Sequence, residues 1–145
     1  MKRDKKFSFL NSEVSTISWV TAYDYPIAYC AEMAGIDMIL VGDSGAMVQH
    51  GHESTLPITM LSMITMCQSV RRGASSTFIV GDMPFGSYEA SDEQAVKHAV
   101  DFLKAGNCDA VKLEGGIRIS SRIRAIAQAG ITVIGHIGLT PQSSI

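Results

Sequence analysis

The chain has few cysteines, no long apolar run and no excess of charge of either sign. Its three cysteines, Cys30, Cys67 and Cys108, are odd in number and form no C-x-x-C pair, which argues against a disulfide framework or a zinc knuckle. No apolar stretch approaches the roughly 20 residues that a membrane-spanning helix needs. Residues 1–15 lack the apolar core of a secretory signal, so we interpret them as a solvated tail. We therefore expect a cytoplasmic protein with no membrane contact.

The charge balance also excludes some classes of partner. Twelve Lys and Arg residues stand against 14 Asp and Glu residues, for a formal net charge of -2. This balance gives no basic face for nucleic acid. With 46% hydrophobic residues in 145, the chain has the composition of one core-forming domain, and small-molecule chemistry is the first class of function to consider.

Short β-branched runs alternate with helical stretches along the whole chain, which predicts an α/β fold with a parallel sheet. We expect strands over residues 16–22, 37–42, 77–81, 109–114 and 131–135, and helices over 26–34, 60–72, 91–105 and 120–129, each helix closed by a left-handed glycine. Ser91 and Gln94 have the spacing of a capping box at the start of the third helix. Five strands and four helices make about half of a (β/α)₈ TIM barrel, but the same count suits a flavodoxin-like open sheet.

Polar residues stand at the carboxyl ends of the last four predicted strands: Asp43, Asp82, Glu114 and His136. In a parallel sheet these ends lie on one side, where α/β folds bind their ligands. Lys112 is two residues before Glu114, so both point to the same face of the strand. A buried lysine with several carboxylates is costly unless a cation compensates the charge, and an all-oxygen ligand set favours Mg²⁺.

Each of these residues also has a purely structural explanation. Asp43 and Asp82 could cap the segments that follow them, Lys112 and Glu114 could form an ordinary ion pair, and His136 could be a hydrogen-bonded core residue. Their recurrence at equivalent strand ends favours a shared site.

Seven motifs in order resemble ketopantoate hydroxymethyltransferase. They are Thr21-Ala-Tyr-Asp-Tyr25, Val41-Gly-Asp-Ser44, Gly51-His-Glu-Ser-Thr-Leu-Pro57, Arg71-Arg-Gly73, Gly81-Asp-Met-Pro-Phe85, Val111-Lys-Leu-Glu-Gly-Gly116 and Gly135-His-Ile-Gly-Leu-Thr-Pro-Gln142. The resemblance runs from about Thr16 to the last residue and covers the first part of the family's usual length.

The resemblance implies a (β/α)₈ barrel of the phosphoenolpyruvate mutase and isocitrate lyase type, with about its first five strands and four helices in residues 16–145. It implies transfer of a hydroxymethyl group from methylene tetrahydrofolate to α-ketoisovalerate, giving ketopantoate on the route to pantothenate. A 2-oxo acid can chelate Mg²⁺ through its carboxylate and ketone oxygens, and the ion stabilises the enolate that attacks the one-carbon unit.

The resemblance also assigns roles to single residues. Asp43 and Asp82 correspond to Mg²⁺ ligands that also line the substrate site, and Glu114 to a third ligand, directly or through water. Ser44 corresponds to a contact of the substrate carboxylate and Lys112 to a hydrogen-bonding partner of the keto acid. His136 matches its motif without an assigned role.

The glutamate that abstracts the proton is expected in the second half of the barrel, beyond Ile145. We therefore expect a truncated form whose open sheet edges favour self-association, with homo-oligomers, decamers among them, known in the family. The main alternative is a catalytically incomplete homologue that binds a 2-oxo acid or associates with full-length subunits. A carbon–carbon lyase of the same superfamily fits the third and the last of these motifs less well. A dinucleotide-binding domain is the weakest option, because no G-x-G-x-x-G opens a helix.

Overall fold

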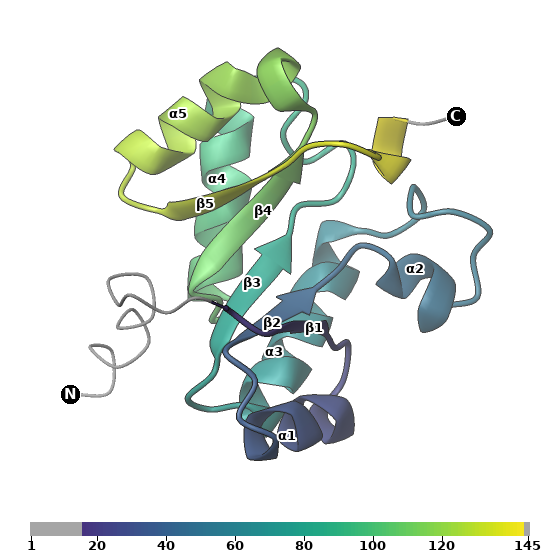
Figure 1. Cartoon of the computed structure of the whole chain (residues 1–145). Coiled ribbons are helices and arrows are strands. Elements are labelled where there is room, and N and C mark those ends of the chain that lie inside the picture. The colour runs from purple at the N-terminus through teal and green to yellow at the C-terminus, as the bar shows by residue number, and fades with distance from the viewer. Residues whose placement is uncertain (1–15, 144–145) are drawn as a thin grey trace.

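The computed structural model describes residues 16–143, which form a parallel β-sheet covered by helices (Figure 1). The elements are β1 Trp19–Thr21, α1 Tyr25–Met33, β2 Met38–Val41, α2 Gly45–Val48, α3 Met60–Gly73, β3 Phe78–Asp82, α4 Asp92–Lys104, β4 Ala110–Glu114, η2 Gly116–Ile119, α5 Ser120–Gln128, β5 Thr132–His136 and η3 Pro141–Ser143. The predicted N-terminal tail, 1–15, lies outside the described residues. Every predicted strand and long helix is present.

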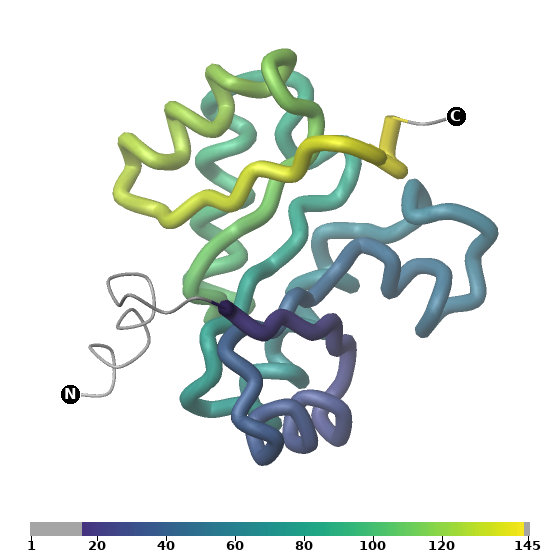
Figure 2. The backbone as a smooth tube through the Cα atoms, viewed as in Figure 1, coloured from purple at the N-terminus to yellow at the C-terminus, as the bar shows by residue number. Residues whose placement is uncertain are grey.

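The strands follow one another through the sheet in the order β1-β2-β3-β4-β5, and all four pairings are parallel. A flavodoxin-like sheet would place β1 between β2 and β3. Consecutive order is that of a barrel, in which each βα unit adds its strand beside the previous one. The order therefore rejects the open-sheet alternative, and the backbone trace shows the chain climbing from β1 to β5 in successive units (Figure 2).

The two faces of the sheet have different surroundings. Ile39, Ile79, Val111 and Leu113 pack with the helices in the main hydrophobic core. On the other face, a second cluster forms around Met38, Phe78, Val80 and Ala110. Because side chains alternate along a strand, Asp82 and Lys112 point to this second face, which is the inner face of the expected barrel.

The start of α4 follows the expected capping pattern with one difference. Ser91 Oγ accepts a hydrogen bond from Gln94 N at 3.0 Å. Gln94 Oε1 accepts from Ala90 N at 3.2 Å, one residue earlier than a capping box predicts. The two side chains still satisfy two backbone donors at this helix terminus.

Two of the four glycines predicted to be left-handed are not. Gly35 and Gly130 have positive φ angles of 75° and 83°. Gly73 and Gly106 do not, and Asn107, with φ of 56°, takes the left-handed position after α4. A Cβ on Gly73 would lie 2.4 Å from the Tyr25 carbonyl oxygen, so glycine is needed there for close packing of α3 against α1.

Partly buried side chains connect the amino ends of the strands. Arg71, near the end of α3, donates to the carbonyl oxygens of Asn107, Ala74 and Thr77 and forms an ion pair with Asp109. The sequence showed Arg71 only as part of the Arg71-Arg-Gly73 motif, whereas in the structure it joins α3 to the segments that precede β3 and β4.

Two further carboxylates act in the same way at this end of the sheet. Asp37 accepts from both the backbone N and Oγ of Ser18, which fixes the entry to β1 beside β2. Glu32 of α1 accepts from Ser76 and Thr77 ahead of β3.

Among the described residues, no helix combines the length and apolar character required to cross a bilayer.

Candidate active site

The carboxyl ends of β2 to β5 bring together the residues that the sequence singled out. Asp82 and Lys112 are register partners on β3 and β4, and Glu114 and His136 are register partners on β4 and β5. Asp43 lies two residues after the end of β2 and is 7% exposed. The parallel register therefore brings together side chains from the carboxyl ends of four strands.

Asp82 lies at the centre of this group. Its Oδ1 is 2.9 Å from Lys112 Nζ, and its Oδ2 accepts a hydrogen bond from Asp43 N at 3.2 Å. Burial raises the pKa of Asp82 to about 7, because the cost of desolvation outweighs the attraction of the Lys112 ammonium and the Asp43 carboxylate adds repulsion. One lysine thus does not compensate the negative charge collected here.

Glu114 is held from two sides. Its Oε1 accepts from Gln142 N at 2.7 Å, and its Oε2 lies 3.3 Å from His136 Nδ1. The same His136 nitrogen is 3.4 Å from Lys112 Nζ, so it can accept from Lys112 or donate to Glu114, but not both. Burial raises the pKa of Glu114. The hydrogen bond from Gln142 N lowers this pKa and repulsion from Asp43 raises it further, so that the net shift is upward.

Ser44 follows Asp43 at the beginning of α2, a short helix that the sequence did not predict. Its Oγ lies 2.9 Å from the hydroxyl of Tyr23. A Cβ on Gly42 would lie 2.8 Å from Ser44 Oγ, so the glycine of the Val41-Gly-Asp-Ser44 motif leaves room for this hydroxyl. Tyr23 is a site residue that sequence reasoning missed, although it lies in the first of the quoted motifs.

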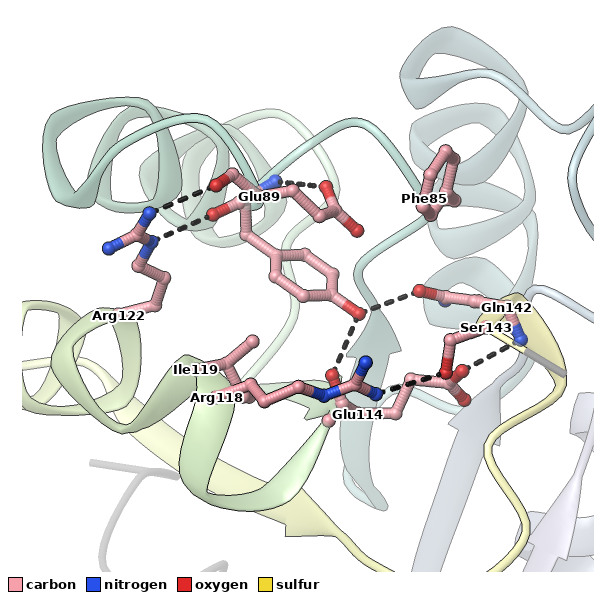
Figure 3. A pocket seen from close by; sticks show the side chains of 10 residues that line it. Phe85, Glu89, Glu114, Arg118, Ile119, Arg122, Gln142 and Ser143 are labelled. Carbon is pink, nitrogen blue, oxygen red and sulfur yellow. Dashed lines mark hydrogen bonds between the residues drawn. The ribbon is translucent and has the colours of Figure 1, made fainter.

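Two hollows adjoin Glu114 and Lys112. A cavity of about 250 Å³ is lined by Phe85, Tyr88, Glu114, Arg118, Arg122 and Gln142. Figure 3 shows Gln142 and Glu114 on one side of it and Arg122 on the opposite side. A more open groove of about 400 Å³ lies on the inner face of the sheet and is lined by Lys112 and His136 with Trp19, Leu40 and Ile134.

The donor set suits a hard cation. Asp43, Asp82 and Glu114 offer carboxylate oxygens at 7%, 2% and 5% exposure, and the raised pKa of Asp82 reflects negative charge that a divalent ion would offset. Within residues 16–143, no three His, Cys, Asp or Glu side chains gather closely enough to ligate one ion together. Mg²⁺ often uses one or two carboxylates and keeps several waters, so the neighbours Asp43 and Asp82 fit it, with Glu114 placed to act through water.

Gln142 and Tyr88 are further parts of the cluster that sequence reasoning did not assign. Gln142 is 2% exposed and reaches Asp43 Oδ2 with its side-chain nitrogen at 2.9 Å. Tyr88 donates to Gln142 Oε1 at 2.6 Å, and burial raises the pKa of its hydroxyl, which keeps it a donor. The Pro-Gln142 end of the last quoted motif was the available signal.

The chain is similar in sequence to known proteins. The sequence model of the family described as ketopantoate hydroxymethyltransferase matches residues 4–145. The 3-methyl-2-oxobutanoate hydroxymethyltransferase of Alkaliphilus metalliredigens is 62% identical over 128 residues, which are 88% of this chain and 45% of that protein. A mitochondrial 3-methyl-2-oxobutanoate hydroxymethyltransferase 2 of Oryza sativa subsp. japonica is 60% identical over 88% of this chain and 32% of its own length.

Solved structures share the fold at low identity. A 2,3-dimethylmalate lyase of the PEP mutase/isocitrate lyase superfamily has a TM-score of 0.71 at 21% identity, over 92% of this chain and 51% of that one. A phosphonopyruvate hydrolase in complex with oxalate and Mg²⁺ has a TM-score of 0.72 at 13% identity, over 92% and 51%. The chain spans less than half the length of the two curated relatives above. On its sequence and its half-barrel fold, the chain belongs to the ketopantoate hydroxymethyltransferase family.

Proposed function

We propose that the site serves the transfer of a hydroxymethyl group from methylene tetrahydrofolate to α-ketoisovalerate, giving ketopantoate in pantothenate biosynthesis. The observation that carries the proposal is the buried pair Asp43 and Asp82 beside Lys112, at the strand ends where a barrel binds its substrate. The names of relatives at 57–62% identity support the same reaction.

Asp43 and Asp82 would hold the Mg²⁺, with Glu114 acting through water. When bound, the ion would offset the negative charge of the carboxylates and stabilise negative charge that develops on the ketone oxygen. The three side chains are buried at fixed backbone positions, so little reorganisation is needed when a cation binds.

Lys112 and Ser44 would orient the keto acid. The Lys112 ammonium faces the inner groove and offers hydrogen bonds to an anionic oxygen, while Ser44 Oγ can donate to a carboxylate. Leu40 and Ile134, which line the same groove, offer an apolar surface for the branched carbon chain of α-ketoisovalerate. His136 borders the groove and lies within 3.4 Å of Lys112, but we assign it no chemical step.

We assign no described residue as the base that abstracts the proton. Glu114 is the only carboxylate named above that contacts His136, yet it also accepts from Gln142 N and serves the metal in this proposal. We propose that a glutamate in the second half of the family's barrel supplies the base.

Binding and turnover experiments test the keto-acid site and the assignment of the base separately. With Mg²⁺, α-ketoisovalerate and methylene tetrahydrofolate, the 145-residue chain alone is expected to bind the keto acid in calorimetry without forming ketopantoate. Addition of the second half of the barrel from the Alkaliphilus metalliredigens relative is expected to restore turnover. Turnover by the chain alone would contradict the assignment of the base, and the absence of any binding heat would contradict the proposed function.

The second candidate is a catalytically incomplete homologue that associates with full-length subunits or with itself. Within residues 16–143, β1 pairs only with β2 and β5 only with β4, and Trp19 and Ile137 are 43% and 80% exposed beside the inner groove. Open edges and exposed apolar groups favour association. Light scattering alone and with a tagged full-length relative distinguishes homo-oligomers, mixed oligomers and monomers.

The cellular compartment is also part of the proposal. Cys30, Cys67 and Cys108 are free thiols, which suits a reducing compartment such as the cytoplasm. Plant relatives carry the word mitochondrial in their names. Localisation of a tagged chain in its own cells would test this part.

A further inference from the structure

Gln142 joins the carboxyl ends of three strands through its side chain and its backbone, although it lies in η3 near the end of the described chain. Its Nε2 donates to Asp43 Oδ2 at 2.9 Å and to Met83 O at 3.0 Å. Its Oε1 accepts from the Tyr88 hydroxyl at 2.6 Å, and its backbone N donates to Glu114 Oε1 at 2.7 Å. Both amide hydrogens and the amide oxygen therefore have partners inside the protein.

This pattern fixes the orientation of the amide. Two acceptors, a carboxylate and a carbonyl, face the nitrogen, and one donor faces the oxygen. The reversed amide would place its oxygen against both acceptors, neither of which has a hydrogen to donate. The Tyr88 hydroxyl also lies 3.1 Å from Glu114 O and can donate or accept, so it suits either orientation. The Asp43 carboxylate and the Met83 carbonyl thus select the orientation in which Gln142 donates to Asp43, and the burial of the cluster keeps water from competing.

The contacts of Gln142 also match what the proposed metal site needs. Its side chain restrains Asp43, and its backbone restrains Glu114, so one residue spans two of the three carboxylates. An amide supplies a donor without adding charge, whereas a lysine would neutralise Asp43 and a glutamate would repel it. Outer groups that hold a ligating carboxylate by hydrogen bonds typically change metal affinity by about 10- to 100-fold.

We propose that Gln142 is a positioning residue, which holds Asp43 and Glu114 in place for the metal and the keto acid. This inference rests on the proposed function for the metal, but its structural core, the control of Asp43 by Gln142, does not. Gln142 touches neither substrate nor metal in this account, and acts through the two carboxylates.

The test uses Gln142→Met, which keeps the length and shape of the side chain but removes both donors. Calorimetry with Mg²⁺ alone is expected to show an affinity about 10- to 100-fold weaker than that of the unchanged chain. Tyr88→Phe removes the contacts of the hydroxyl with the amide oxygen and with Glu114 O but leaves both donors of Gln142 in place, so it is expected to weaken Mg²⁺ binding by less than about threefold. Equal Mg²⁺ affinities in Gln142→Met and the unchanged chain would overturn the proposal.

Gln49 provides a matched control for the substitution itself. Its Nε2 donates to Asp24 Oδ2 at 3.2 Å, the same amide-to-carboxylate contact, but on the exposed surface. Gln49→Met is expected to leave Mg²⁺ affinity unchanged. A similar loss in both variants would show that the effect comes from the substitution and not from the site, and would overturn the proposal.

A crystal structure of metal-free Gln142→Met separates failure of this inference from failure of the proposed function. We expect the Asp43 carboxylate to leave its position beside Asp82 or to occupy more than one rotamer. An unmoved Asp43 would overturn the positioning role whatever the metal data show. A displaced Asp43 together with no Mg²⁺ binding by the unchanged chain would support the positioning role and contradict the magnesium assignment.

Discussion

The two ends of the parallel sheet use the same residue types in opposite ways. At the amino ends of the strands, Asp37 and Glu32 each accept several hydrogen bonds from neighbouring donors. At the carboxyl ends, Asp43, Asp82 and Glu114 lie near one another around one lysine. One end has enough donors for its carboxylates and the other has too few.

The pKa values express this difference. Hydrogen bonds from Ser18 lower the pKa of Asp37, and at Glu32 the hydrogen bonds from Ser76 and Thr77 outweigh the desolvation that would raise its pKa. At the carboxyl ends, desolvation and mutual repulsion raise the pKa of Asp82 to about 7 and also raise that of Glu114. The amino ends therefore stabilise the fold, while the carboxyl ends hold charge that a ligand can use.

The largest effect is expected at the amino ends. Arg71→Ala removes four hydrogen bonds, one of them within the ion pair with Asp109, and is expected to lower the free energy of unfolding by about 3–5 kcal/mol. Urea denaturation measures the change. The side chain of the exposed neighbour Arg72 donates to Ser69 Oγ. Arg72→Ala should therefore lower the free energy of unfolding by less than about 0.5 kcal/mol. Similar losses in both variants would contradict the special role of Arg71.

Substitutions at the carboxyl ends of the strands are expected to change the affinity for Mg²⁺. Asp82→Asn removes one carboxylate of the proposed Mg²⁺ pair and is expected to weaken Mg²⁺ binding by more than about 100-fold, as measured by calorimetry. The same substitution at the other end, Asp37→Asn, should leave the affinity unchanged and lower the melting temperature. If Asp82→Asn bound Mg²⁺ normally, the division between the two ends would lose its basis.

The metal-free chain should lose stability as the pH rises. The pKa of Asp82 is higher in the folded than in the unfolded state, so its stabilising contribution is full below the unfolded value near 3.8 and disappears as the pH passes about 7. Between pH 5.5 and pH 8 the expected loss is about 2 kcal/mol in the free energy of unfolding, measured in EDTA. Mg²⁺ should restore more stability at pH 8 than at pH 5.5, and Asp82→Asn should flatten the profile. A flat profile in the unchanged chain would contradict the raised pKa.

The smallest effect is expected from Glu32→Gln, with a loss of about 1 kcal/mol at pH 7. The pKa of Glu32 is lowered in the folded state, so its contribution is present above the unfolded value near 4.5 and is lost as the pH falls through the folded value. The difference between the variant and the unchanged chain should therefore shrink at low pH, opposite in sign to the behaviour of Asp82. Thermal denaturation across pH 3–7 measures it, and a difference that grows toward acid would be evidence against the comparison.

Much of the fold was predictable because its signals are local. The helix starting at Ser91 follows from a capping residue and an apolar stripe, and Asp82, Lys112 and Glu114 share the inner face because side chains alternate along a strand. The glycine predictions failed at Gly73 and Gly106 because close packing, and not a left-handed turn, requires a residue without a Cβ there. The short helix α2 has no apolar periodicity to reveal it.

The sequence by itself determined the alternation of strands and helices, the family, and the placement of acidic residues at strand ends, since each depends on patterns between near neighbours. Only the tertiary structure decided the order of the strands and the partners of each carboxylate. Gln142 reaches Asp43 across 99 positions of the chain, and the Tyr88 hydroxyl donates to Gln142 across 54 positions. Such contacts arise when parallel strands bring their ends together, and their specificity comes from hydrogen bonds that form only once water has been excluded.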